Sequence, residues 1–259
     1  MKKYVNLFVF VFMVGACFSQ GKAQTKSAVS YKNPVVDIAM PDPTVIKAAD
    51  GYFYMYATES TRNVPIMKSK DLVQWTYCNT AFTNKTRPRF EPKAGIWAPD
   101  INYINNKYVL YYAMSVWGGE QTCGIGVATA DSPQGPFTDH GKMFRSNEIG
   151  VQNSIDPSFL QYEGRNYLVW GSFRGIYVIE LTEDGLSLKP GAEKKRIAGT
   201  AFEAAYIHKH GDYYYMFASI GSCCEGIRST YKVVVGRSKK VWGPYKDKSG
   251  KPMLKNGYS

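Results

Sequence analysis

Histidine, cysteine and long apolar runs are scarce in this sequence, and each scarcity excludes a class of protein. The 259 residues include three His and five Cys. The cysteines lie at positions 17, 78, 123, 223 and 224, and these spacings match no zinc-binding motif. After residue 15 no stretch approaches the roughly 18 apolar residues that a membrane-spanning helix needs. We therefore expect neither a Cys/His metal site nor a transmembrane helix in the mature protein.

Charged residues are also few, at 20% of the chain, although the formal net charge is +11. The basic excess is scattered, and its densest clusters are the short runs at 194–196 and 239–240. No predicted helix arrays these charges along one face, as a nucleic-acid patch would require. We therefore expect no nucleic-acid partner and interpret the charges as solvated surface, with attraction to an acidic cell-wall polymer as the alternative.

The first 23 residues have the features of a secretory signal. Two lysines precede an apolar run from Tyr4 to Gly15, and Gly21-Lys-Ala23 offers a cleavage site. Removing residues 1–23 takes away three lysines and lowers the net charge to +8. Val14-Gly-Ala-Cys17 also resembles a lipobox, which would make Cys17 an acylated N-terminus and a lipid anchor. Either way we expect an exported protein, periplasmic, extracellular or cell-surface, with residues 24–259 as its domain.

Aromatic residues are abundant, and they recur in an internal repeat. The chain has 20 Tyr and 13 Phe, which favours a sheet-rich domain. Each repeat begins with an acid, runs through a short apolar strand, turns at a Gly, Asn or Asp cluster and returns as an aromatic strand. The four repeats occupy residues 42–58, 100–114, 156–172 and 203–219. Further strands are predicted after each repeat, beginning near residues 66, 126, 176 and 235.

Repeats of roughly 50 residues, with four short strands each, are typical of the blades of a β-propeller. The fold class predicted is therefore all-β. In a propeller the first strand of each blade lines the central channel, so the four repeat-initial acids are expected to converge at one end of it. These acids are Asp42, Asp100, Asp156 and Glu203. Asp-Pro is also common in turns. Acids at the same position of each repeat nevertheless favour the interpretation that one acts as an acid and another as a base.

Several motifs resemble the five-bladed propellers of glycoside hydrolase family 43. Ile96-Trp-Ala-Pro-Asp100 and Asn153-Ser-Ile-Asp-Pro157 match motifs of that family. The stretch Cys223-Cys-Glu-Gly, followed by Ser229-Thr-Tyr231, is similar to the arabinanases within it, which cut α-1,5-linked arabinan. The resemblance covers residues 33–259. It implies that arabinan, or a related plant cell-wall polysaccharide, is the substrate of a monomeric enzyme.

The resemblance also implies roles for three of the acids. Asp42 matches the general base that activates water, Glu203 matches the general acid, and Asp156 matches the residue that modulates and orients that acid. Glu203 is then expected to be protonated near neutral pH. Members of the family invert the anomeric centre, so the Asp42 and Glu203 carboxyl groups are expected to lie roughly 6.5 to 9.5 Å apart. Asp100 matches no catalytic role, and we expect it to cap a turn or to touch substrate.

Candidates for sugar contact lie close to these acids. Trp97 offers a flat apolar face to a sugar ring, although packing between blades would also account for it. Asn153, Ser172 and Phe173 are the other candidates, since they flank the third repeat. Cys223 and Cys224 suggest either a vicinal disulfide or two buried thiols, with a structural role rather than a catalytic one. The histidines at 208 and 210 are expected at the surface of a turn.

The sequence supplies about four of the five blades that the resemblance implies. The expected fifth blade holds a Gly-Pro-Gly-His motif whose His lies near a bound ion, often calcium, and that motif is absent from this sequence. We interpret the chain as C-terminally incomplete and name no metal ligands in it. Three functions remain open: an endo-acting arabinanase, an exo-acting arabinofuranosidase or β-xylosidase, and an inactive carbohydrate-binding fragment.

Overall fold

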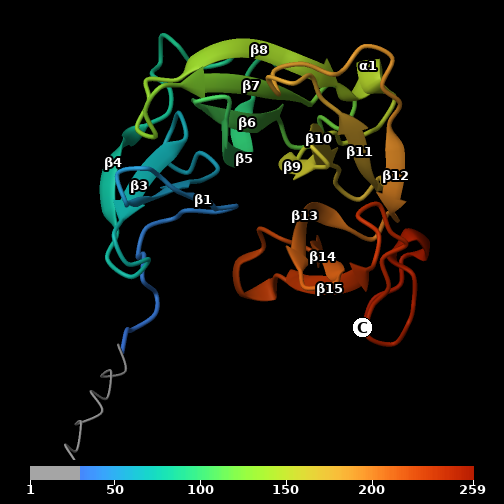
Figure 1. Ribbon diagram of the computed structural model, residues 1–259. Coiled ribbons are helices and arrows are strands. Elements are labelled where there is room, and N and C mark those ends of the chain that lie inside the picture. The colour runs from blue at the N-terminus through green and yellow to red at the C-terminus, as the bar shows by residue number, and fades with distance from the viewer. Residues whose placement is uncertain (1–29) are drawn as a thin grey trace, which may run out of the picture. The chain divides into compact units, whose positions relative to one another are not determined.

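The computed structural model describes residues 30–259, and residues 33–259 form one compact unit within them. The predicted signal segment 1–23 and Cys17 lie outside the described residues. Four antiparallel sheets follow one another along this unit and surround a common centre (Figure 1). The all-β propeller arrangement predicted from the repeats is confirmed, with four blades among residues 33–259. Within residues 30–259 no helix has the length and apolar character to cross a membrane.

Each of the first three blades has four strands in chain order, and the first strand lies nearest the centre (Figure 1). Blade one contains β1 (Thr44–Lys47), β2 (Phe53–Tyr56), β3 (Pro65–Ser69) and β4 (Thr76–Thr80). Blade two contains β5 (Gly95–Ile104), β6 (Lys107–Ser115), β7 (Gly124–Ala130) and β8 (Thr138–Arg145). Blade three contains β9 (Ser158–Tyr162), β10 (Arg165–Trp170), β11 (Ile176–Glu180) and β12 (Lys195–Ala198). The short helix α1 (Ser146–Ile149) links blades two and three.

Blade four differs from the prediction of four strands. Its sheet contains β13 (Glu203–His210), β14 (Tyr213–Ile220) and β15 (Lys232–Ser238). Beyond β15 the predicted fourth strand is reduced to two isolated bridges, Arg237 to Lys246 and Lys246 to Pro252. Pro244 lies at the start of this segment and has no N–H to donate to a strand ladder. Two 3₁₀ turns, η1 (Gly226–Arg228) and η2 (Met253–Lys255), complete the elements of residues 30–259.

The hydrophobic core lies between neighbouring blades, and the aromatic second strands supply much of it. Along β6, Leu110 and Tyr112 pack toward blade one, whereas Val109 and Tyr111 pack toward blade three. This strand is buried on both faces because side chains alternate along a strand. The tyrosine pair at 111 and 112 is therefore explained by packing between blades.

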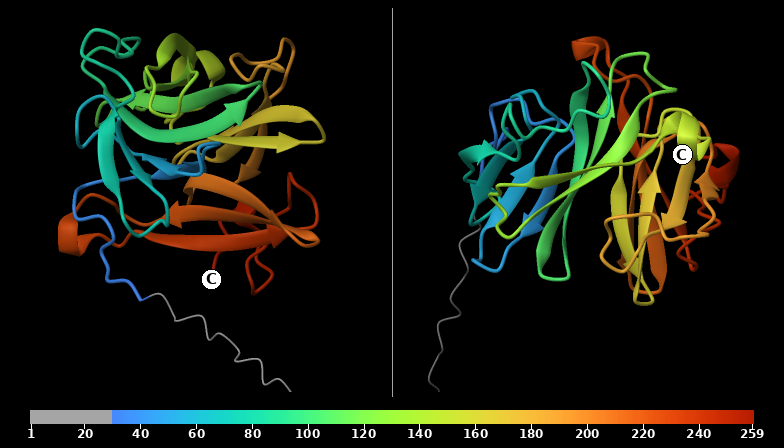
Figure 2. Two further views of the ribbon diagram at one scale, coloured as in Figure 1. Left: turned by 60° about the vertical axis from the view of Figure 1, so that its left-hand side comes forward. Right: turned by 90° about the horizontal axis from the view of Figure 1, so that it is seen from above.

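Blade four buries one face of its sheet and exposes the other. Met216 and Ala218 on β14 pack toward blade three. On the opposite face Phe217 lies between Tyr206 on β13 and Val235 on β15 in the strand register. These three side chains are exposed, from 39% for Phe217 to 53% for Tyr206. Two further views show this sheet and its neighbours from the side and from above (Figure 2).

Candidate active site

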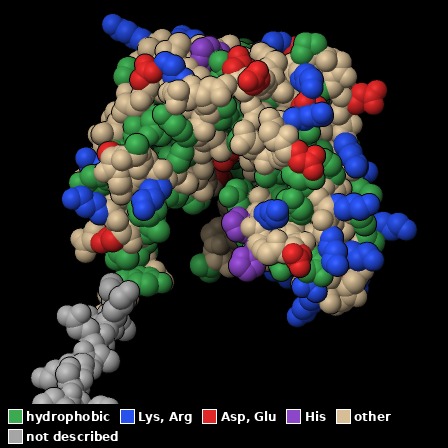
Figure 3. All heavy atoms as spheres, in the orientation of Figure 1, with side chains coloured by type: hydrophobic (Ala, Val, Ile, Leu, Met, Phe, Trp, Pro, Cys, Tyr) green, Lys and Arg blue, Asp and Glu red, His purple; other side chains and the backbone are tan. Residues whose placement is uncertain are grey.

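The three acids predicted to act together lie at the first strands of their blades. Asp42 precedes β1, Asp156 precedes β9, and Glu203 is the first residue of β13. The inner strands β1, β5, β9 and β13 are neighbours around the centre of the unit (Figure 1). A space-filling view shows a hollow at this centre with acidic side chains at its bottom (Figure 3).

The backbone at two of these acids is in the left-handed region. Asp42 has a φ of 51° and Asp156 has a φ of 59°, and a proline follows each of them. Ala204, which follows Glu203, has a φ of 51°. Left-handed conformations are costly for non-glycine residues and cluster at functional sites. A turn before a strand, the simpler explanation for Asp-Pro, does not require this conformation in two different blades.

The three carboxyl groups form one electrostatic cluster. Burial raises the pKa of Asp156 well above its usual range, and the charges of Glu203 and Asp42 raise it further. The backbone N–H of Ala204 opposes this shift by donating to the Asp156 carboxylate. Like charges in a buried pocket resist simultaneous ionisation. The cluster is therefore suited to retaining a proton near neutral pH.

Thr58 orients Asp42. Its Oγ1 donates to Asp42 Oδ2 at 2.5 Å, and its N–H donates to the carbonyl of Pro41 at 2.9 Å. The same Oγ1 accepts a hydrogen bond from the N–H of Ala98 at 2.7 Å. Asp42 itself is exposed, so its other oxygen can reach a water molecule.

Glu203 is buried, at 8% exposure, and two predicted sugar contacts hold it. Ser172 Oγ donates to Glu203 Oε2 at 2.6 Å, and Asn153 Nδ2 donates to Ser172 Oγ at 2.8 Å. Gly171, which has a φ of 132°, allows this turn, because a Cβ there would lie 2.2 Å from the carbonyl oxygen of Gly175. Ser172 and Asn153 are thus brought to the acid, where they orient its carboxyl group.

Trp97 and Phe173 belong to an apolar wall beside the acids. Trp97 is half-buried, and its ring centroid lies 5.6 Å from that of Trp117, which is 77% exposed. A cavity of about 610 Å³ lies beside Trp117, and its lining also includes Phe173 and the Cys223–Cys224 pair. We call Trp97, Trp117 and Phe173 the aromatic wall. Flat rings that are accessible from a cavity suit the stacking of sugar rings.

The loop of Trp117 is fastened to blade three. Arg174 donates to both carboxylate oxygens of Glu120, from Nε at 3.0 Å and from Nη2 at 2.9 Å. The N–H of Asn153 donates to the carbonyl of Glu120 at 2.8 Å. Because Arg174 follows Phe173 directly, these bonds hold the two sides of the aromatic wall together.

The adjacent cysteines lie at the edge of this cavity as thiols. Cys223 is half-buried and Cys224 is exposed, so the expectation of two buried thiols is wrong for Cys224. Their Sγ atoms lie 2.6 Å apart. Burial, the neighbouring Cys224 and the charges of Glu203 and Asp42 raise the pKa of Cys223 to about 12. A thiol held in its protonated form is a poor nucleophile, so Cys223 is unsuited to covalent catalysis.

Asp100 does not cap a turn, contrary to one of the two roles expected for it. Its Oδ2 accepts hydrogen bonds from the N–H of Phe159 at 2.7 Å and from Asn102 Nδ2 at 2.8 Å. Its Oδ1 lies 3.5 Å from Thr44 Oγ1. Asp100 therefore links the inner strands of blades one, two and three. Burial, only partly offset by these hydrogen bonds, raises the pKa of Asp100 to about 6.

Replacing Asp100 by Asn should flatten part of the dependence of stability on pH. The folded-state pKa of Asp100 is raised, so the neutral form favours folding and this contribution is lost as pH rises from about 4 to about 6. The wild-type loss should be up to about 3 kcal/mol, from a shift of roughly two units. Urea unfolding at pH 4.5 and pH 7.5 would measure about 2 kcal/mol of it, because part of the loss occurs below pH 4.5. If the free energy of unfolding changed by the same amount between the two pH values in wild type and in Asp100→Asn, the prediction would be contradicted.

Among residues 30–259 no three His, Cys, Asp or Glu side chains are gathered so that they could hold a metal ion. The His that the family resemblance places near a channel ion is not in the sequence. His208 and His210 are exposed, as predicted.

Three residues of the site were not predicted from the sequence. They are Thr58, Trp117 and Tyr231. Burial raises the pKa of Tyr231 far above its usual range, and the charges of Glu203 and Asp156 raise it further, so this hydroxyl lies close to the acids. Three of the four aligned repeats end with a hydroxyl, at Thr58, Ser172 and Ser219, and this shared position is the signal that could have identified Thr58.

Comparisons with known proteins agree with this geometry. The model of Glycosyl hydrolases family 43 matches residues 31–259. The chain is 39% identical to the extracellular endo-α-(1→5)-L-arabinanase 1 of Bacillus subtilis over 230 residues, covering 83% of this chain and 70% of that protein. It is 34% identical to the extracellular exo-α-(1→5)-L-arabinofuranosidase ArbA of Cellvibrio japonicus over 246 residues, covering 84% of this chain and 69% of that protein.

The fold is also similar to solved arabinanase structures. The α-L-arabinanase of Cellvibrio cellulosa, alone and in complex with arabinohexaose, superimposes with a TM-score of 0.77 at 33% identity. The superposition covers 86% of this chain and 78% of that one. The propeller blades and the acid cluster are the features expected for the family whose model matches the chain. This chain belongs to glycosyl hydrolase family 43 and is a glycoside hydrolase.

Proposed function

We propose that this chain hydrolyses internal α-1,5 linkages of arabinan with inversion of the anomeric configuration. The observation that supports this most directly is the acid cluster, in which the pKa of Asp156 responds to both Glu203 and Asp42. The B. subtilis relative is named an endo-arabinanase, and the C. cellulosa structure was determined with arabinohexaose. Arabinan is accordingly the substrate proposed.

In this proposal Asp42 is the general base. It accepts a proton from a water molecule, whose oxygen then attacks the anomeric carbon. The exposure of Asp42 gives water access to it, and Thr58 fixes one of its oxygens. An inverting enzyme needs room for this water, so the Asp42 and Glu203 carboxyl groups are expected to lie roughly 6.5 to 9.5 Å apart.

Glu203 is the proposed general acid, and Asp156 is its partner. As the bond between the anomeric carbon and the leaving oxygen breaks, Glu203 gives its proton to that oxygen. Repulsion among the three carboxylates favours the retention of a proton in the cluster. Ser172 holds Glu203 Oε2 through a hydrogen bond of 2.6 Å, which fixes the direction of the acid.

The aromatic wall supports action within a chain over action at its end. Trp97, Trp117 and Phe173 extend the surface beside the acids, and the adjoining cavity of about 610 Å³ can hold more than one sugar ring. Exo action on arabinan is the second candidate, because the C. japonicus relative is named an exo-acting arabinofuranosidase. β-Xylosidase activity has no comparable support.

The proposal places the reaction outside the cytoplasm. The relatives from B. subtilis and C. japonicus are named extracellular proteins, which supports export of this chain. We propose residues 1–23 as the signal and residues 24–259 as the catalytic domain, acting as a monomer. Acylation of Cys17, with anchoring to a membrane surface, is the alternative processing route.

The time course of products from linear α-1,5-arabinan tests this proposal. An endo-acting enzyme should first release a ladder of oligosaccharides with a rapid fall in viscosity, whereas an exo-acting enzyme should release one small product from the start. Proton NMR of the first product should show the inverted anomer. If the chain bound arabinan but released no reducing sugar, the inactive binding fragment would replace the enzyme as the explanation.

A further inference from the structure

A buried ion pair lies behind Asp42 and Trp97. Arg87, in the loop between β4 and β5, donates from Nη1 and Nη2 to the two carboxylate oxygens of Glu59 at 2.8 Å each. The side chains are 7% and 10% exposed. Charged side chains are seldom buried without a specific need, because removing them from water is costly.

Glu59 holds the strand that contains Trp97. Its Oε1 accepts from the N–H of Ile96 at 3.0 Å, and its own N–H donates to the Ile96 carbonyl at 3.1 Å. Its Oε2 accepts from the N–H of Asn63 at 2.7 Å. Burial opposes ionisation, but the hydrogen bonds from Arg87, Asn63 and Ile96 hold the pKa of Glu59 below its usual value. Glu59 is therefore an ionised anchor for the residue that precedes Trp97.

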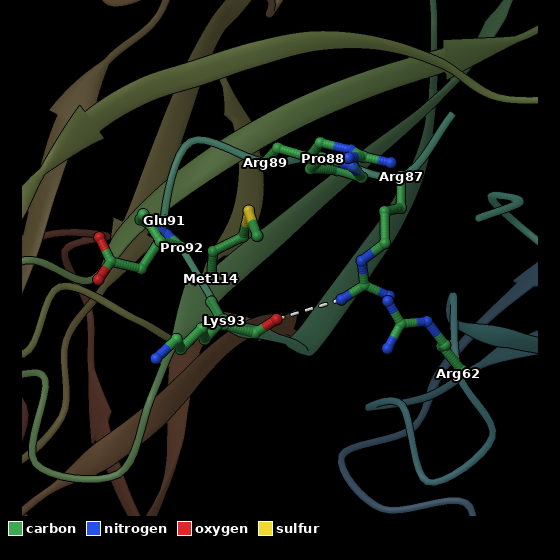
Figure 4. A pocket seen from close by; sticks show the side chains of 9 residues that line it. Arg62, Arg87, Pro88, Arg89, Glu91, Pro92, Lys93 and Met114 are labelled. Carbon is green, nitrogen blue, oxygen red and sulfur yellow. Dashed lines mark hydrogen bonds between the residues drawn. The ribbon is translucent and has the colours of Figure 1, made fainter. Parts of the chain in front are cut away.

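Arg87 extends this anchor to the start of β5. Besides Glu59 it donates to Asn63 Oδ1 at 2.8 Å and to the carbonyl of Ala94 at 3.1 Å. Figure 4 shows the Arg87 side chain reaching across the loop with this last bond drawn as a dashed line. The guanidinium group of Arg87 thus makes its hydrogen bonds to other residues of the protein, although Arg87 also lines a cavity of about 330 Å³.

Thr58, the residue before Glu59, joins this anchor to the proposed base. It donates to Asp42 on one side and accepts from the N–H of Ala98 on the other. Residues 58 and 59 therefore bind Asp42 and both neighbours of Trp97, while Arg87 fixes them from the buried side. The network ties the position of the water-activating carboxylate to that of a sugar-stacking ring.

We infer that Glu59 and Arg87 are a positioning pair that fixes Asp42 and Trp97 relative to each other. This inference rests on the proposed function, in which Asp42 activates water and Trp97 contacts sugar. Small displacements of a catalytic group are costly, since a shift of about 1 Å can lower the rate roughly 100-fold. Loss of the pair should therefore affect both turnover and sugar binding.

Two variants avoid leaving one buried charge without its partner. Arg87→Lys keeps the charge but cannot form the two parallel bonds, and Glu59→Gln with Arg87→Met removes both charges. Lys107→Met is the matched control, because Lys107 pairs with Asp131 at the surface. We expect each pair variant to lower kcat on linear arabinan about 10-fold to 100-fold and to weaken arabinohexaose binding several-fold, with the control unchanged. Tryptophan fluorescence would report the Kd.

Azide separates a positioning role from a general loss of folded protein. On an aryl arabinofuranoside with a good leaving group, azide attacks the anomeric carbon without a base, and the aryl oxygen leaves with the electron pair. Pair variants should regain rate with azide, as Asp42→Ala should, and yield the arabinosyl azide. Unfolded protein would not respond. Circular dichroism would establish that each variant is folded.

Folded pair variants with wild-type kcat and Kd would overturn the inference, as would a loss of rate that azide leaves unchanged. A failure of the proposed function would be seen in a different measurement, because the wild-type chain itself would then not hydrolyse arabinan. In that case the Kd comparison between wild type, pair variants and control still decides whether the pair positions Trp97 for sugar.

Discussion

Replacing Glu203 by Gln is expected to lower the hydrolysis of linear arabinan by about 100-fold to 10,000-fold. A general acid contributes roughly 10²-fold to 10⁴-fold, and an amide cannot give a proton to the leaving oxygen. Gln has nearly the same shape as Glu and can still accept the hydrogen bond from Ser172 Oγ, so the variant should fold and bind arabinohexaose. Initial rates of reducing-sugar release, with binding measured by tryptophan fluorescence, would test this.

The choice of substrate provides the control for this variant. An aryl arabinofuranoside with a good leaving group needs little protonation as the bond breaks, so Glu203→Gln should retain much more of its activity on it than on arabinan. An equal loss on both substrates would argue that Glu203 does not act as the acid. Activity within about 10-fold of wild type on arabinan would exclude that role directly.

The blades could be predicted from the sequence because their signal repeats. Each repeat shows the same order of an initial acid, alternating apolar and polar residues, and turn residues. Because side chains alternate along a strand, this order predicts where each residue lies in the sheet. β6 illustrates the point, since its unbroken apolar run places Tyr111 and Tyr112 against different neighbouring blades. The prediction failed for the last strand of blade four, where Lys246 makes only isolated bridges.

The acids of the site could be predicted for the same reason, and their supporting residues could not. Asp42, Asp156 and Glu203 share a repeat position, so the topology alone brings them together. Arg87 and Trp117 lie in loops without periodicity, and their places depend on contacts with residues distant in sequence. Asn153 and Ser172 are predicted to touch sugar, and their hydrogen bonds lead to Glu203, a contact that the repeats do not indicate.

The site combines an exposed carboxylate and a buried one, and this difference suits their proposed roles. Asp42 is open to solvent, from which a base must draw its water. Glu203 is 8% exposed and lies beside Asp156, whose pKa is raised by burial and by both other acids. Burial and like charge favour the protonated form of Asp156, so the cluster favours the retention of one proton. An exposed carboxylate beside this buried cluster suits a proton acceptor and a proton donor in one pocket.

Replacing Asp42 by Asn is expected to lower the hydrolysis of arabinan by a similar factor, about 100-fold to 10,000-fold, but without the recovery on an aryl substrate that Glu203→Gln should show. The amide can still accept the hydrogen bond from Thr58, so the backbone and the site should stay in place. It cannot remove a proton from water, and this step is needed whatever group leaves. The aryl arabinofuranoside should therefore give no recovery in this variant.

The two variants together separate the base from the acid. The rates of both variants should be measured on arabinan and on the aryl substrate. Only Glu203→Gln should regain activity on the aryl substrate. Recovery of Asp42→Asn on the aryl substrate would reverse the assignment of the two carboxyl groups, because only the loss of an acid is compensated by a better leaving group. The exposed position of Asp42 and the buried position of Glu203 both favour the assignment made here.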